Sequence, residues 1–294
     1  MKRTSAVIGA SGQVGEHCLA ALKRVDEMTT YGTYAHHARP DLLPLDVTDA
    51  EQFERFVGQA RPDVIYFAAS IANVDTCEQH PDETYVTNVL GVHNAVQAAN
   101  RFGCKLVYLS SEYLFDGTAG PYHEPAATKP LCVYGWQKLA AEHFIAAFAS
   151  NWLIVRTAVV YSWESQGKNF LYRLRGRLLQ GEPIDVPVDQ VSTPTYAPDL
   201  VQAMIDLAER KESGVFNICG RVAASRYQFA VAAAELFGLD PTLVKPVLTA
   251  DLHQPARRPL NAGLTVHKTE RVLGRPMLDY SAGLREMARR IPGN

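Results

Sequence analysis

Short apolar runs alternate with longer segments of helical pattern along most of the chain. Thr4 to Ile8, Asp63 to Ala69 and Lys105 to Leu109 suit strands, and the last two are apolar enough to be buried on both faces of a parallel sheet. The other predicted strands are Thr29 to Ala35, Leu43 to Val47, Trp152 to Arg156 and Gly214 to Ile218, and helical patterns span about 13–25, 82–102, 134–149 and 170–179. This alternation predicts an α/β fold: a doubly wound parallel sheet (Rossmann-like) with a smaller C-terminal substrate lobe.

The pattern changes after residue 160, where a loop rich in glycine, serine and tryptophan precedes a basic helix and a polar strand. We therefore expect a dinucleotide-binding domain over 1–160, with 195–220 returning to the sheet. The segments 161–194 and 221–294 would form the substrate-binding lobe, the second of them contributing two helices and loops. A length of 294 residues suits one α/β domain with such a lobe.

Composition and charge narrow the function classes. A net charge of −2 gives no electrostatic reason to expect nucleic acid or an acidic membrane surface as a partner. No apolar stretch approaches membrane-spanning length, and no signal-peptide core follows Lys2 and Arg3. Five cysteines without a C-x-x-C pair predict reduced thiols, a cytoplasmic location and no metal site.

Three glycines stand between the first strand and the first helix, at Gly9, Gly12 and Gly15. Glycines at such a turn let the backbone approach a pyrophosphate and bring the helix close to the strand, while free N–H groups at the helix start bind phosphate. An ordinary glycine-rich turn is the alternative. We favour dinucleotide binding, and the expected cofactor contacts in this loop are Gly9, Ser11, Gly12, Gln13, Val14 and Gly15.

The end of the second strand indicates which dinucleotide is bound. An acidic residue there binds the ribose 2′-hydroxyl of NAD, whereas basic residues accommodate the 2′-phosphate of NADP. No Asp or Glu lies between Thr29 and Pro40, but His36, His37 and Arg39 do. The sequence therefore favours NADP(H), with NAD(H) left open and exposed loop residues as the alternative explanation. The third strand should bring its end, near Asp46 and Val47, past the adenine.

Tyr134 and Lys138 are four residues apart at the start of a predicted helix, so their side chains share one helix face. A nearby ammonium lowers the pKa of a phenol, which could then exchange a proton with a carbonyl or alcohol oxygen. Ser111 follows a buried strand, at the sheet edge where open α/β folds bind ligands. Each residue alone has an ordinary structural explanation. Together they suit hydride transfer, in which the protein supplies orientation and a proton.

These motifs resemble the extended short-chain dehydrogenases/reductases, and within them the dTDP-4-dehydrorhamnose reductases. The resemblance is carried by Gly9-x-x-Gly12-x-x-Gly15, Ser111 and Tyr134-x-x-x-Lys138. Further matching blocks are Val74 to Glu78, Ser110 to Gly117, Arg156 to Ala158, Lys168 to Phe170, Asp189-Gln190 and Arg258 to Asn261.

The resemblance implies a role for each matched residue. The loop from Gly12 to Val14 would bind the pyrophosphate, and Lys138 would hold the phenol and a hydroxyl of the nicotinamide ribose. Tyr134 would protonate the C4 oxygen of a keto sugar, and Ser111 with Glu112 would contact that sugar. The residues expected along the cofactor path are Asp46, Val47, Ala68, Ala69, Ser70 and Leu109.

Three departures from the family pattern concern the substrate. Ser111-Glu112 replaces the usual Thr-Asp, Val159 stands where the family has tryptophan, and the aromatic residue usual near the C-terminal end could correspond to Tyr280. Arg258, in Arg257-Arg258-Pro259, is a candidate contact for a diphosphate, with a surface turn as an equal alternative. The predicted substrate-binding set is Ser111, Glu112, Tyr134, Val159 and Arg258.

These observations predict an NADPH-dependent reductase of a nucleotide-linked 4-keto-6-deoxy sugar, compatible with a homodimer. One alternative is an NADP(H)-binding regulatory subunit resembling the β subunit of methionine adenosyltransferase. Another is a nucleotide-sugar epimerase or dehydratase, which the absence of an acidic residue after the second strand disfavours. The nucleotide base, the sugar stereochemistry, the oligomeric state and any need for Mg²⁺ stay open.

Overall fold

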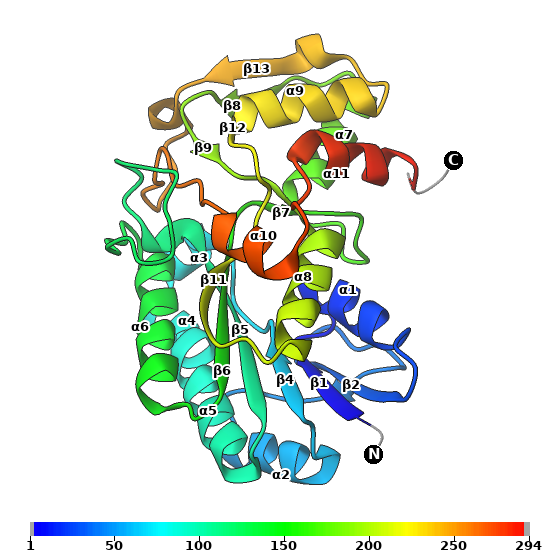
Figure 1. Ribbon diagram of the computed structural model, residues 1–294. Coiled ribbons are helices and arrows are strands. Elements are labelled where there is room, and N and C mark those ends of the chain that lie inside the picture. Colours follow the sequence, from blue (N-terminus) through cyan, green and yellow to red (C-terminus); the bar gives the residue numbers. More distant parts are fainter. Residues whose placement is uncertain (1–2, 291–294) are drawn as a thin grey trace.

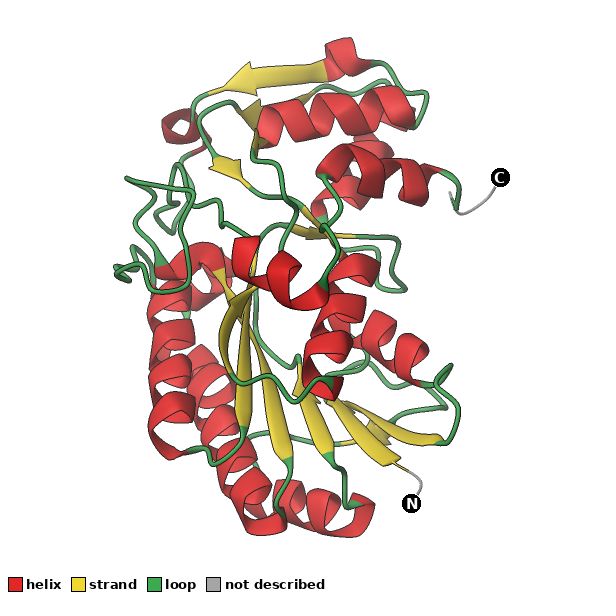
Figure 2. Cartoon of the chain, viewed as in Figure 1, coloured by secondary structure: helices red, strands yellow, loops and turns green. Residues whose placement is uncertain are grey.

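The computed structural model describes residues 3–290, and its larger part is built around a seven-stranded parallel sheet (Figures 1 and 2). Its strand order is β11-β6-β5-β4-β1-β2-β3. The strands are β1 (Arg3–Ile8), β2 (Met28–Tyr34), β3 (Leu43–Pro44), β4 (Val64–Phe67), β5 (Lys105–Ser111), β6 (Trp152–Thr157) and β11 (Gly214–Asn217). The predicted doubly wound, Rossmann-like fold is confirmed.

Helices cover both faces of this sheet. One face carries α1 (Gln13–Leu22) and α8 (Ala197–Glu209), which pack together, and α10 (His267–Leu273) packs against α8 and β11. The opposite face carries α2 (Ala50–Ala60), α5 (Gly91–Phe102) and α6 (Val133–Phe148). Near the carboxyl ends of the strands lie α3 (Val74–Gln79) and α4 (Pro81–Tyr85).

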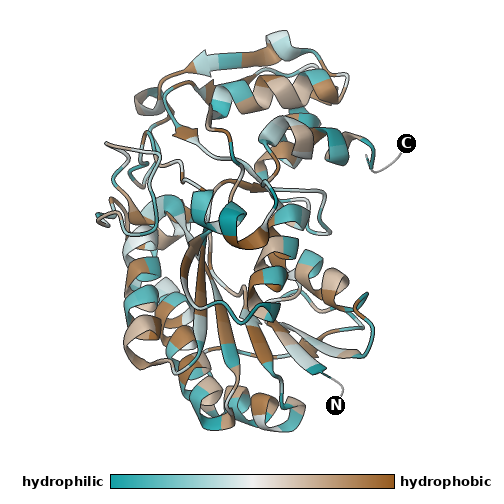
Figure 3. Ribbon diagram, in the orientation of Figure 1, coloured by the Kyte–Doolittle hydropathy of each residue, from teal (hydrophilic) through white to brown (hydrophobic). Residues whose placement is uncertain are grey.

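Alternate residues of each strand enter different cores, because successive side chains point to opposite faces of a sheet. In β1, Val7 joins the core under α1 and α8, while Ala6 and Ile8 join the core under α2, α5 and α6. In β6, Leu153 packs on the first side and Ile154 on the second. Apolar strands between helices of mixed polarity are visible in Figure 3. This two-sided burial explains why the strands read as continuous apolar runs.

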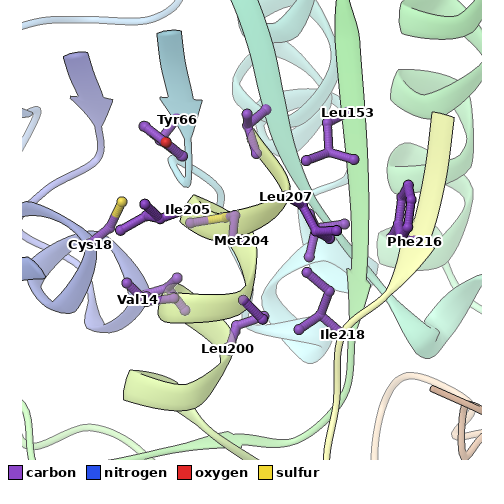
Figure 4. Close-up of a cluster of buried hydrophobic side chains, with 14 of the residues drawn as sticks. Val14, Cys18, Tyr66, Leu153, Leu200, Met204, Ile205, Leu207, Phe216 and Ile218 are labelled. Carbon is purple, nitrogen blue, oxygen red and sulfur yellow. The ribbon is translucent and has the colours of Figure 1, made fainter. Parts of the chain in front are cut away.

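The core under α1 and α8 fixes the helix that begins at the glycine loop. Val14 and Cys18 of α1 face Met204 and Ile205 of α8, beside Tyr66 of β4 (Figure 4). Each of these five side chains is at least nine-tenths buried. Burial of this kind stabilises by roughly 1.5–3 kcal/mol for each large apolar side chain, so the start of α1 is held firmly against the sheet.

The C-terminal part has a third core of its own, above the carboxyl ends of the sheet strands (Figure 1). Its helices are α7 (Phe170–Leu179), α9 (Arg226–Leu236) and α11 (Tyr280–Ala288). Its short strands are β7 (Val160–Tyr161), β8 (Ile184–Pro187), β9 (Val191–Ser192), β10 (Thr195–Tyr196), β12 (Ala224–Ser225) and β13 (Val244–Val247). The division into a dinucleotide-binding domain and a substrate lobe at the predicted boundaries stays a prediction.

Several predicted elements differ from those found. The helix expected over 82–102 is divided by a π-helical turn, Val86–Leu90, between α4 and α5. The segment after residue 221 holds three α-helices among the described residues, where two were expected, and α2 was not predicted. Asp49 accepts a hydrogen bond from the Gln52 N–H at 2.9 Å and so caps the start of α2. This capping residue could have indicated a helix, but α2 has few buried apolar residues and was therefore missed.

Candidate active site

The glycine loop between β1 and α1 has the close contacts that the sequence predicts. Gly9 has φ +81° and its Cα side faces Ala69, where an added Cβ would lie 2.8 Å from backbone atoms. A Cβ on Gly15 would lie 2.1 Å from the Gly9 carbonyl oxygen. The Gly12 N–H donates to that oxygen at 3.0 Å. Gly9 and Gly15 are therefore needed for close packing of the loop against the end of β4 and of α1 against the end of β1, which is the packing found at dinucleotide-binding turns. Binding of a pyrophosphate by this loop stays a prediction.

The residues expected along the cofactor path lie at the carboxyl ends of neighbouring strands. Ala68 and Ala69 follow β4, and the Ser70 hydroxyl donates to Asn88 Oδ1 at 3.0 Å. The Leu109 carbonyl, in β5, accepts from Lys138 Nζ at 3.0 Å. These residues therefore lie at the carboxyl edge of the sheet, on the side of the glycine loop, and their contact with a cofactor stays a prediction.

The loop after β3 is held by local hydrogen bonds. Asp46 Oδ1 accepts from both the backbone N–H (2.9 Å) and the hydroxyl (2.8 Å) of Thr48. Val47 is buried against Gly91 of α5, where an added Cβ would meet it at 2.7 Å. The structure thus places Asp46 and Val47 at the carboxyl edge of the sheet, and their adenine contact stays a prediction.

Basic groups gather after β2. His36 and His37 are exposed, and the Arg39 guanidinium pairs with Asp41 through two contacts of 3.2 Å. Arg39 also lies 3.9 Å from Glu16 of α1. Asp41 and Glu16 thus both restrain the position of the Arg39 guanidinium.

Ser111, Tyr134 and Lys138 meet at the carboxyl end of β5. Ser111 ends the strand and accepts a hydrogen bond from the Tyr113 N–H at 3.2 Å. Tyr134 and Lys138 lie in the first turns of α6, and both side chains are more than nine-tenths buried. Gly135 lets α6 approach this strand end, because a Cβ there would lie 2.2 Å from the Tyr113 carbonyl oxygen. The close approach of α6 to the end of β5 therefore brings together three residues that are separated in the sequence.

The ionisation of this pair differs from the sequence expectation. Burial raises the pKa of the Tyr134 phenol, and the nearby Ser111 hydroxyl opposes that rise less strongly. Burial also lowers the pKa of the Lys138 ammonium to about 8. Lys138 Nζ lies 5.8 Å from the centre of the Tyr134 ring and donates to Leu109 instead. The expected lowering of the Tyr134 pKa by Lys138 is not found: burial raises this pKa above its ordinary value, and the phenol holds its proton at neutral pH.

Glu112 lies at the floor of a cleft between the sheet and the C-terminal part. The cleft has about 390 Å³ of space, part of which is open solvent, and is lined by Glu112, Tyr113, Val159, Gln190, Val191, Ser192, Pro194, Ala224, Arg226, Phe229, Pro259 and Ala262. The Ser192 hydroxyl donates to Glu112 Oε2. Burial raises the pKa of the Glu112 carboxyl to about 7, against the opposing influence of this hydrogen bond and of Arg226.

We expect the Glu112→Gln variant to become more stable relative to the wild type as pH rises. A raised folded-state pKa contributes stability that is complete below the ordinary value of 4.5 and is lost as pH rises through about 7. The difference in free energy of unfolding should therefore grow by roughly 2–3 kcal/mol across this window. Urea denaturation of both proteins at a series of pH values measures it. Parallel pH profiles would contradict the raised pKa.

Val159 has an unusual backbone in the same cleft. Its φ is +40°, a left-handed conformation that β-branched residues rarely adopt, and its carbonyl accepts from the Thr195 N–H at 3.1 Å. Strain of this kind costs about 1–3 kcal/mol and is concentrated at functional sites. The structure thus places Val159, a predicted substrate contact, on the wall of the cleft.

The Arg258 side chain does not line the cleft. Its Nη2 donates to Asp75 Oδ2 of α3 at 2.7 Å, its Nε donates to Gln254, and its guanidinium carbon lies 6.0 Å from the centre of the Tyr113 ring. It is not among the residues that line the cleft, although Pro259 is. The Arg258 guanidinium therefore joins the C-terminal part to α3, and its predicted contact with substrate stays a prediction.

A family model matches almost the whole chain. The model described as the RmlD substrate binding domain covers residues 4–292. The chain belongs to this family. The RmlD family membership accounts for the matching motif blocks found along the sequence.

Proteins similar to this chain include dTDP-4-dehydrorhamnose reductases and a subunit of a methionine adenosyltransferase. A dTDP-4-dehydrorhamnose reductase of Mycobacterium tuberculosis (strain CDC 1551 / Oshkosh) is 33% identical over 86% of this chain and 81% of its own. The crystal structure of dTDP-4-dehydrorhamnose reductase from Bacillus anthracis str. Ames in complex with NADP has a TM-score of 0.89 and 27% identity, covering 99% of this chain and 100% of that one. Methionine adenosyltransferase 2 subunit beta of Xenopus tropicalis is 26% identical over 97% of this chain and 86% of its own.

Two residues of this RmlD-family cleft were not singled out from the sequence. Arg226 is the first residue of α9, after the Ser225 cap, and Ser192 ends β9. The Ser225–Gln228 capping box predicts a helix start there, but nothing in the spacing predicts that the start faces Glu112.

Within residues 3–290, no group of three or more His, Cys, Asp or Glu side chains is arranged to hold a metal ion. No helix of that range is long and apolar enough to cross a membrane.

Proposed function

We propose that this chain is an NADPH-dependent reductase of a nucleotide-linked 4-keto-6-deoxy sugar, and specifically of dTDP-4-dehydrorhamnose. The observation that carries the proposal is the meeting of Ser111, Tyr134 and Lys138 at the carboxyl end of β5, on the sheet edge that also carries the glycine loop after β1. Membership of the RmlD family and the similarity to dTDP-4-dehydrorhamnose reductases support the same substrate class.

NADPH, when bound, supplies the hydride, and the side chains of this chain supply binding, orientation and the proton. The residues proposed to hold it are those of the glycine loop, His36 and Arg39, the loops after β3 and β4, and Leu109, Tyr134 and Lys138. Tyr134, kept protonated by burial, donates its proton to the C4 oxygen as the alcohol forms. The Ser111 hydroxyl hydrogen-bonds the same oxygen and polarises the carbonyl.

Lys138 has two proposed tasks at this site. Its ammonium, already bonded to the Leu109 carbonyl, fixes a positive charge behind the phenol that stabilises the phenolate left after proton transfer. The same ammonium can bond a hydroxyl of the nicotinamide ribose. Glu112, Val159 and Arg258 complete the proposed substrate set; Glu112 and Val159 line the cleft directly, whereas Arg258 borders it through Tyr113.

The test is turnover by the purified protein. With NADPH and dTDP-4-dehydrorhamnose, loss of NADPH absorbance should accompany formation of the dTDP-linked 6-deoxy alcohol, identified by mass spectrometry. UDP-linked 4-keto sugars provide the comparison for the base. Absence of turnover with every 4-keto nucleotide sugar would remove the assignment.

A regulatory role is the second candidate, favoured by the match to methionine adenosyltransferase 2 subunit beta. A purely regulatory subunit does not require the Ser111, Tyr134 and Lys138 set, which is why we rank this function lower. Co-purification with a larger catalytic protein, together with no reductase activity, would reverse the order. An epimerase or dehydratase would instead retain a nicotinamide cofactor through purification, which analysis of the bound nucleotide detects.

A further inference from the structure

The segment 162–169, between β7 and α7, lies against the glycine loop and the start of α1. Gln166 Nε2 donates to the Ser11 carbonyl at 2.6 Å, and Gln13 Nε2 donates to the Ser162 hydroxyl at 2.9 Å. Ser165 donates to Glu16 Oε2 through its N–H and its hydroxyl, at 3.1 and 2.7 Å. This segment of the C-terminal part is therefore tied to the loop and helix start that would hold a pyrophosphate.

Glu164 shapes this segment from within. Its buried carboxylate accepts the backbone N–H groups of Gln166 (2.7 Å), Gly167 (3.0 Å) and Lys168 (2.7 Å). A carboxylate with three backbone donors fixes the turn, because charge-assisted hydrogen bonds are stronger than neutral ones. The backbone of Lys168 is therefore fixed, and its side chain extends from an ordered turn.

Lys168 reaches the end of β2. Its Nζ lies 3.3 Å from His37 Nε2, although 131 residues separate the two in sequence. In a dinucleotide-binding sheet, this strand end is where the 2′-substituent of the adenosine ribose is recognised. Arg39, nearby, is paired with Asp41 and approaches Glu16. By contrast, Lys168 has no carboxylate oxygen within 4.0 Å in the range 3–290.

We propose that Lys168 is a specificity-determining residue that completes a site for the 2′-phosphate of NADPH, together with His37 and Arg39. This inference rests on the proposed function, which it deepens by adding a residue from the C-terminal part. A lysine ammonium binds phosphate as a point charge, and a dianionic group at this strand end faces basic side chains from two sides. The phosphate would join the end of β2 to the segment that covers the glycine loop.

The competing explanation is a solvent-exposed lysine that happens to lie beside a histidine. It predicts no preference for a 2′-phosphate, and a change at Lys168 would then alter binding of all adenine nucleotides equally or not at all. Ligands that differ only in the 2′-phosphate therefore separate the two explanations.

The experiment is calorimetric titration of the full-length protein with adenosine 2′,5′-bisphosphate and, separately, with adenosine 5′-monophosphate. Lys168→Met keeps the length of the side chain and removes its charge. It should weaken binding of the bisphosphate about tenfold and leave the monophosphate within about twofold of the wild type. Lys168→Arg should retain most of the preference, and raising the salt concentration should narrow it.

Lys245→Met is the matched control, since Lys245 is an exposed lysine of β13 whose ammonium donates to the Thr242 carbonyl. It should change neither affinity. Unchanged bisphosphate binding by Lys168→Met, or equal weakening of both ligands, would overturn the role of Lys168 and leave the reductase proposal standing. Failure of the wild type to bind either nucleotide would overturn both proposals.

Discussion

Replacing Tyr134 with phenylalanine should lower kcat for reduction of dTDP-4-dehydrorhamnose about a thousandfold, the usual scale for loss of a general acid. The variant removes one oxygen and keeps the ring, which packs edge-on against Tyr113 with centroids 5.7 Å apart. Binding of NADPH should be affected much less than kcat, because the glycine loop is unchanged. Steady-state kinetics and a fluorescence titration of NADPH measure the two effects separately.

Tyr85→Phe is the matched control for this change. Tyr85 ends α4 and its side chain is exposed, so the same loss of an oxygen should leave kcat within about twofold of the wild type. If Tyr134→Phe retained kcat within about threefold as well, Tyr134 would not be the acid. Reduction would then depend on a proton from another group, and the Ser111 hydroxyl would be the first candidate to test.

The second large effect concerns stability. Arg156 of β6 and Glu142 of α6 form a buried ion pair, with Nη2–Oε2 and Nε–Oε1 distances of 2.6 and 3.0 Å. Arg156→Met leaves the Glu142 carboxylate buried without its partner and should lower the free energy of unfolding by about 3–5 kcal/mol. Chemical denaturation measures this loss. Combining Arg156→Met with Glu142→Leu should recover part of it, since no unpaired charge then remains.

Arg55→Met tests whether the burial of the pair is the cause. Arg55 pairs with Glu51 on α2 at 3.3 Å, but both side chains are more than half exposed, and such a pair contributes about 0–1 kcal/mol. A loss for Arg156→Met no larger than that for Arg55→Met would show that the buried pair does not stabilise the fold. The pair lies one turn beyond Lys138 on α6, so the single variant could also displace the proposed catalytic lysine.

The sheet and its helices could be predicted because their signals are local. Val7 alternates with Ala6 and Ile8 between two cores, and such burial leaves a continuous apolar run in the sequence. The Tyr134–Lys138 spacing likewise needs only the helix period. The π-helical turn before α5 carries no comparable local signal, and α2 was missed because only Phe53 and Val57 of its residues are buried.

Contacts between distant segments account for the parts of the site that the sequence does not reveal. Ser192 donates to Glu112 across 80 positions, and Arg258 meets Asp75 across 183. Neither pairing follows from spacing, since each depends on how the C-terminal part is placed on the sheet. The raised pKa of Tyr134 also depends on distant segments, because it is caused by burial of the phenol, and this burial requires all the segments that pack around the start of α6. Backbone position at Val159 is set by Thr195, which is also remote.

Asn88, in the π-helical turn Val86–Leu90, connects three parts of the site. Its side chain accepts from the Ser70 hydroxyl and the Ile71 N–H, and it donates to Gln137 Oε1 of α6 at 2.8 Å. Deleting one residue from this turn would rotate everything before it by about 100° relative to α5. Natural variation here should therefore consist of exchanges at exposed positions such as Val86 and Leu90, while insertions and deletions are selected against. The π-helical turn therefore fixes the number of residues in the chain between the glycine-loop side of the sheet and the helix that carries Tyr134.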